Sequence, residues 1–148
     1  MARAPQGGDT DQLRGIVSGE CGIAVSNTYY FARALRKNVK GLSASIGKIG
    51  WVFPDQSGNG THMNISAGGV AVNAPNKENA IKFLEYLAGD SAQQYFSAGN
   101  DEYPAVPGVG LSKSVAALGL FRQDDIKLDD VAKNAALATE IFNQVGWE

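Results

Sequence analysis

Apolar residues recur every three or four positions along much of the chain, which is the period of a helix with one buried face. The clearest stretch begins after Asn76, where Ile81, Leu84 and Leu87 share one face. Polar capping residues and glycines bound the other stretches, because such residues favour helix starts and helix ends respectively. We therefore predict helices over residues 10–19, 29–38, 77–88, 91–99, 115–118 and 129–145.

Short apolar runs between these helices have the length and the boundaries of strands. They cover residues 21–25, residues 49–53, which Pro54 ends, and residues 61–72. Strands separated by helices define an α/β fold. Three or four strands are too few for a complete doubly wound sheet, so we predict a helix-rich α/β fold with an unfinished core.

The composition excludes some classes of protein. A formal net charge of −2 gives no electrostatic reason to bind nucleic acid or an anionic membrane surface. No stretch approaches the roughly 18 apolar residues of a membrane-spanning helix. A single cysteine, Cys21, rules out an internal disulfide framework and a multi-cysteine metal site. We therefore expect a globular protein with no nucleic-acid partner.

The chain offers little for catalysis. His62 is the one histidine, so a triad has a single available base, and Ser66 lacks the flanking residues of a nucleophile elbow. Residues 41–48 have the wrong glycine spacing for a phosphate-binding loop, and Ile49 stands where Ser or Thr would ligate magnesium. We therefore predict that the protein is not an enzyme.

Two adjacent tyrosines, Tyr29 and Tyr30, follow the capping pair Asn27 and Thr28 at a predicted helix start. In α/β folds, the end of a strand and the start of a helix expose functional groups to a cleft. Phenolate oxygen is a hard ligand that suits Fe³⁺, and a nearby trivalent ion favours loss of the phenol proton. The alternative is packing, although neighbouring helical positions point about 100° apart, so at most one ring would face the core. Adjacency alone leaves both roles open.

The segments around this pair resemble the bacterial periplasmic ferric-ion-binding proteins, the solute receptors of iron ABC importers. The similar segments follow one another in the family's order through nearly the whole chain, and they are specific in combination. They are Gly7–Asp9, Asp11–Arg14, Gly19–Cys21, Asn27–Tyr30, Val52–Gln56, Gly60–Ser66, Ala74–Ala80 and Glu102–Pro104. The resemblance implies part of a type II periplasmic-binding-protein fold, an α/β clamp whose two lobes hold Fe³⁺ between them.

By this resemblance Tyr29 and Tyr30 are iron ligands, and Asn27 contacts a synergistic anion such as carbonate or phosphate. Members of the family are much longer than this chain, and residues 1–8 contain no apolar signal segment. The resemblance therefore implies the C-terminal portion of a receptor, with incomplete lobes. It assigns residues 1–60 to the tyrosine-bearing lobe and residues 61–104 to the opposite lobe. Residues 105–148 would be helices that return to the first lobe.

The implied function is capture of Fe³⁺ in the periplasm and its delivery to an ABC permease. We expect only half of the iron site in this chain, and incomplete lobes leave apolar faces uncovered, which favours a homo-oligomer. Two alternatives stay open. One is a receptor for a small anion, bound by Asn27, Thr28 and the helix start. The other is an oligomeric interaction module that binds nothing small.

Overall fold

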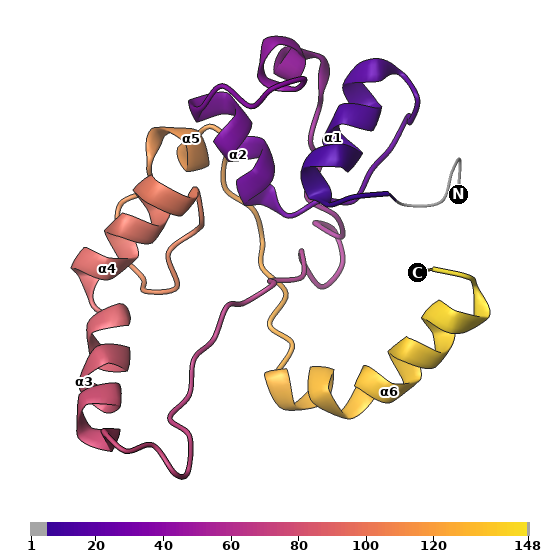
Figure 1. Cartoon of the computed structure of the whole chain (residues 1–148). Helices are drawn as coiled ribbons and strands as arrows, with labels where there is room; N and C mark the ends of the chain where they lie inside the picture. Colours follow the sequence, from indigo (N-terminus) through magenta and orange to yellow (C-terminus); the bar gives the residue numbers. More distant parts are fainter. Residues whose placement is uncertain (1–5, 148) are drawn as a thin grey trace.

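The computed structural model describes residues 6–147, which form helices joined by long extended segments (Figure 1). The α-helices are α1 (Asp9–Ser18), α2 (Thr28–Arg36), α3 (Lys77–Leu87), α4 (Asp90–Tyr95), α5 (Lys113–Ala116) and α6 (Leu128–Gln144). A 3-10 helix, η1 (Ser43–Lys48), follows α2, and a π-helical turn, η2 (Phe96–Asn100), continues α4. The predicted helices are thus confirmed, with ends that differ by a few residues.

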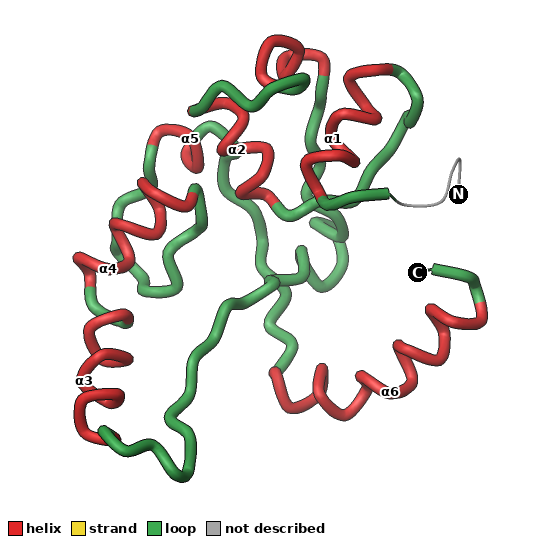
Figure 2. The backbone as a smooth tube through the Cα atoms, viewed as in Figure 1, coloured by secondary structure: helices red, strands yellow, loops and turns green. Residues whose placement is uncertain are grey.

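Residues 6–147 contain no β-strand, so the strands predicted over 21–25, 49–53 and 61–72 are wrong (Figure 2). A strand requires a hydrogen-bonded neighbour, and apolar alternation alone cannot provide one. In the first of these segments Ile23 and Val25 are 90% and 77% exposed, so its apolar side chains lie in water. The segments are extended, and among residues 6–147 their one β-bridge is the isolated pairing of Thr61 with Gln123.

The buried core lies where α1, α2 and η1 pack together. Leu13 of α1 and Phe31 and Ala32 of α2 are almost fully buried there, and Leu42 before η1 closes the cluster at 1% exposure. Leu118 joins from the far end of the chain. Burial of these apolar faces stabilises α2, whose short length would leave it marginal as an isolated helix. The core therefore fixes the position of α2.

An ion pair fastens α2 to the second half of the chain. Asp101 is completely buried, and both of its carboxylate oxygens accept hydrogen bonds from Arg36, at 2.7 Å each. Ser114, in α5, donates to Asp101 Oδ1 at 2.7 Å. These bonds join α2 to α5 and to the end of η2, and α5 packs against both of the other elements.

Two distant segments cross beside Thr61. Thr61 N–H donates to Arg122 O and Asp124 N–H donates to Thr61 O, both at 2.9 Å. Gln56 reinforces the crossing, since its Nε2 donates to Arg122 O at 2.9 Å and its Oε1 accepts from Arg122 N–H at 2.7 Å. These hydrogen bonds therefore join the segment at residues 56–61 to the segment at residues 122–124.

Large parts of the described surface are apolar. α6 stands apart from the other helices (Figure 1), and its residues after Asp130 are all exposed. In α3 no residue is buried, and Ile81 is 41% exposed. No helix in residues 6–147 is long and apolar enough to cross a membrane. The expectation about a signal segment concerns residues 1–8, and residues 1–5 lie outside the described part of the chain.

Candidate metal centre

The first turn of α2 holds the two tyrosines side by side. Asn27 is the N-cap in extended conformation, and Thr28 begins the helix, as the capping pattern predicted. The rings of Tyr29 and Tyr30 lie with centroids 4.3 Å apart and planes inclined at 32°. Both side chains are half-buried, so neither is lost in the core. The structure thus brings the two phenols together, although successive helical positions normally diverge.

Arg33 lies over both rings. Its guanidinium carbon is 5.5 Å from each ring centroid, a distance typical of a cation–π contact. Because Arg33 is one helical turn beyond the pair, the spacing of α2 itself produces this arrangement. The arginine holds the two rings against the same face of the helix and contributes positive charge beside them.

The surroundings keep Tyr29 protonated in the metal-free protein. Hydrogen bonding with the Tyr30 side chain, burial, and the negative charge of Asp9 raise the pKa of Tyr29 from 10.0 to about 12, against a smaller lowering by Arg33. A metal ion that coordinates the Tyr29 oxygen must therefore displace the phenol proton, which the raised pKa makes harder to remove. A trivalent cation can do so, because its charge favours the phenolate strongly.

Asn27 is fully engaged in hydrogen bonds. Its backbone N–H and its Nδ2 donate to Asp9 Oδ2 at 2.7 and 3.0 Å. Its Oδ1 accepts from Asn64 Nδ2 at 3.0 Å. The Ser26 hydroxyl, which has a single proton to donate, lies 3.2 Å from Asn27 O and 3.4 Å from the same Asp9 oxygen. The residue predicted to contact an anion therefore already contacts a carboxylate of its own chain.

Three residues at this site were not predicted from the sequence: Asp9, Arg33 and Asn64. Gly8 takes the N-cap position of α1, and the Asp9 side chain turns to Asn27. The three- and four-residue spacing of Arg33 from Tyr30 and Tyr29 was the available signal, whereas nothing local connects Asp9 or Asn64 to Asn27.

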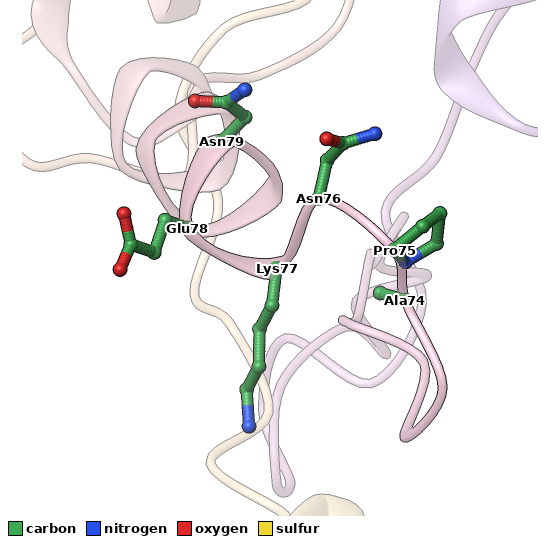
Figure 3. Close-up of a pocket in the computed structure, with 6 residues that line it drawn as sticks. All are labelled: Ala74, Pro75, Asn76, Lys77, Glu78 and Asn79. Carbon is green, nitrogen blue, oxygen red and sulfur yellow. The ribbon is translucent and has the colours of Figure 1, made fainter.

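Other places for a metal or ligand are weak. Within residues 6–147, no group of three or more His, Cys, Asp or Glu side chains could hold a metal ion. An open depression of about 360 Å³ lies at the start of α3 (Figure 3). It is lined by residues 74–79, and the side chains of Lys77, Glu78 and Asn79 diverge rather than point to a common centre. The tyrosine pair remains the candidate site.

The chain belongs to the family of bacterial extracellular solute-binding proteins, whose profile matches residues 6–123. Among its curated relatives is iron uptake protein A1 of Synechocystis, which is 44% identical over 148 residues. That alignment covers 100% of this chain but 41% of the relative. The chain thus spans less than half the length of this relative.

Solved structures show the same likeness. The Trichodesmium protein IdiA (FutA), in complex with iron and citrate ligands, is 44% identical with a TM-score of 0.92, covering 100% of this chain and 47% of that chain. The ferric binding protein of Campylobacter jejuni is 34% identical, again with a TM-score of 0.92, covering 100% and 47%. The predicted family and the partial type II periplasmic-binding-protein fold are therefore confirmed. The relatives are named for iron uptake and binding, not for catalysis.

Proposed function

We propose that this chain is the tyrosine-bearing part of a receptor that captures Fe³⁺ and delivers it to an ABC permease. The observation that carries the proposal is the pair of half-buried phenols at the start of α2, with rings 4.3 Å apart. Two hard oxygen ligands at one point suit a hard trivalent cation. The names of the relatives, which refer to iron uptake and to ferric binding, support the same cargo.

Binding would proceed by exchange of protons for metal. Tyr29 and Tyr30 would each lose a proton as their oxygens coordinate Fe³⁺, so metal affinity should rise with pH. The high pKa of Tyr29 means that weaker Lewis acids compete poorly, because they stabilise the phenolate less. Further ligands would come from parts of the receptor that this chain does not include.

We also propose the lobe assignment of residues 1–60, 61–104 and 105–148. The hydrogen-bonded crossing at Thr61 supports a boundary there, because the outgoing and returning segments meet at that point. Rotation about such a crossing would let two lobes close around the metal. The extracellular family and the iron-uptake relatives support a periplasmic location and a permease partner.

The test combines two substitutions in the protein that carries this sequence. Ferric nitrilotriacetate added to the native protein should produce the visible band of tyrosinate bound to iron. Tyr29→Phe with Tyr30→Phe should abolish that band and tight binding, because both phenol oxygens are removed.

Tyr95→Phe is the matched control, because Tyr95 is 70% exposed and lies on α4 away from the pair. It should leave the band unchanged. A double variant that keeps the native colour and affinity would show that other groups hold the metal.

The small-anion receptor has less support. Its proposed donors at Asn27 already bond to Asp9, so an incoming anion would have to displace a carboxylate. Titration of the metal-free protein with anions separates this function from iron capture.

A further inference from the structure

Asn59 and Gly60 end the turn that leads into the crossing at Thr61, and they are the one Asn-Gly pair in the sequence. An asparagine followed by glycine is the pair that deamidates most readily, because glycine has no side chain to hinder attack by its backbone nitrogen on the carboxamide. Asn59 is exposed, and among the hydrogen bonds of residues 6–147 none involves its side chain. Its carboxamide carbon is therefore accessible to such an attack.

The crossing itself requires the glycine. Gly60 is buried and has a φ of 108°, a conformation that residues with side chains rarely adopt. A Cβ atom at this position would lie 2.6 Å from both the carbonyl carbon and the carbonyl oxygen of Gln123. The close approach of the two segments thus places the residue that makes Asn59 reactive directly after it.

The closed crossing restrains the reaction. The Gly60 N–H donates to Asp55 O at 2.9 Å, and the Asn59 N–H donates to Asp55 Oδ2 at 2.8 Å. For deamidation the Gly60 nitrogen must lose that proton and turn toward the Asn59 side chain. The two hydrogen bonds and the contact of Gly60 with Gln123 hold it in place, so attack requires the crossing to open.

We propose that Asn59 is a modification site that is converted to isoaspartate when the crossing opens, and that the modified crossing cannot close again. The Gly60 nitrogen forms a bond to Asn59 Cγ, and the side-chain nitrogen leaves as ammonia. Water then opens the resulting succinimide ring to aspartate or isoaspartate.

Isoaspartate makes the backbone one carbon longer between residues 59 and 60. Gly60 can then no longer fit against Gln123, where no space is left around its Cα. The new carboxylate also lies in the same turn as Asp55, and like charges repel. The modification therefore records opening of the crossing irreversibly, and it does so whether or not the proposed iron site is correct.

The test follows deamidation in the 148-residue chain at mildly alkaline pH, by peptide mass mapping and by labelling with isoaspartyl methyltransferase. Gln56→Ala removes both side-chain hydrogen bonds to the Arg122 backbone. It should speed deamidation of Asn59 at least about tenfold, because the crossing opens more often and the free-energy barrier falls. Equal rates in the native chain and in Gln56→Ala would overturn the proposal.

Two controls separate this effect from general unfolding. Gln144→Ala is the same substitution in α6, where the side chain bonds only to Glu140, and it should leave the Asn59 rate unchanged. Asn73 is exposed and is followed by alanine, so it serves as an internal reference in each chain. Acceleration of Asn73 by the same factor as Asn59 would contradict a specific role of the crossing.

Hydrogen exchange tests the consequence of the modification. The amides of Thr61 and Asp124 donate across the crossing, so they should exchange slowly in fresh protein and fast after conversion of Asn59 to isoaspartate. Asn59→Asp adds the charge without lengthening the backbone, and it should retain more protection than the isoaspartate form. Isoaspartate-containing protein whose two amides stay as protected as in fresh protein would show that the crossing still closes, against the proposal.

Discussion

Among single residues, Tyr29 has a pKa that its neighbours raise to about 12. Its phenol lies between the negative charge of Asp9, which raises its pKa, and the positive charge of Arg33, which lowers it. Hydrogen bonding with Tyr30 has the largest effect and also raises the pKa. The neighbouring Tyr30 side chain thus favours the protonated form of Tyr29.

Tyr30→Phe tests that coupling. It removes the hydrogen bond and the repulsion from Tyr30, so the pKa of Tyr29 should fall from about 12 toward 10.0. Ultraviolet titration of tyrosinate in the metal-free protein measures the shift. Tyr95→Phe should leave the high-pH step of Tyr29 in place. A Tyr29 that still ionises near 12 in Tyr30→Phe would contradict the assigned cause.

The raised pKa of Tyr29 also makes the stability of the fold depend on pH. Between pH 10.0 and about 12 the folded chain keeps the Tyr29 proton, whereas an unfolded tyrosine has lost it. The unfolded state binds fewer protons in this window, so this contribution to stability is complete below pH 10.0 and is lost as pH rises toward 12.

Residue chemistry was only partly visible in the sequence. Asn27, Tyr29 and Tyr30 lie within four consecutive positions, which left both a ligand role and a packing role open until the resemblance to a family favoured the first. Asp9 is separated from Asn27 by 18 positions, and a first-turn acidic residue has an ordinary local explanation. Only tertiary structure shows where its side chain goes.

Among the elements, the buried Asp101 sets how α2, η2 and α5 fit together. Burial raises the pKa of Asp101, but hydrogen bonds from Arg36 and Ser114 and the positive charge of Arg36 outweigh burial and hold the pKa below 3.8. A lowered pKa means that this stability is present above pH 3.8 and is lost as the pH falls through the folded value.

Asp101→Asn should therefore destabilise the fold by about 1.5–3 kcal/mol at neutral pH, because the buried side chain loses its charge-assisted hydrogen bonds from Arg36. Asn is the suitable replacement, since Asp101 has a φ of 65° and Asn tolerates that left-handed conformation. Urea unfolding at neutral and at acid pH measures the effect, and the difference between native and variant should shrink in acid.

Asp130→Asn is the control for that substitution. It breaks the ion pair with Lys133, in which the Lys133 side chain is 73% exposed and the Asp130 side chain 50% exposed. Because both partners are exposed, the substitution should change stability by less than about 1 kcal/mol. Equal losses from the two variants would show that the Asp101 contact is no stronger than a surface pair.

Element prediction succeeded for helices and failed for strands for one physical reason. A helix satisfies its backbone hydrogen bonds locally, so the apolar period and caps around α3 suffice to locate it. A strand depends on a neighbour elsewhere in the chain. Residues 21–25 have strand composition, yet no described segment pairs with them, as the exposure of Ile23 and Val25 shows.

For the whole molecule, the uncovered apolar surface is the dominant feature. Large apolar side chains are exposed on α6, where Leu137 and Ile141 are 55% and 48% exposed, and on α3, where Phe83 is 59% exposed. Surfaces of this kind favour association. The overall arrangement nevertheless matches longer proteins with a TM-score of 0.92 over the whole chain.

The 148-residue chain alone should therefore self-associate in sedimentation velocity, with a mass that rises with concentration. Leu137→Lys with Ile141→Lys should weaken this association, because it places charges on the apolar face of α6. Thr139→Lys, at an exposed position of the same helix, should have little effect. A compact monomer at every concentration would contradict this expectation.

The crossing held by Gln56 has a consequence for the order in which the molecule folds. It joins residues 66 positions apart, whereas α1, α2 and η1 build most of their core from the first third of the chain. Contacts between near neighbours form quickly, and closing a long loop adds an entropic delay. We expect the core to form early and the crossing late. The hydrogen bonds between Gln56 and Arg122 would then form only after the segments on both sides have folded.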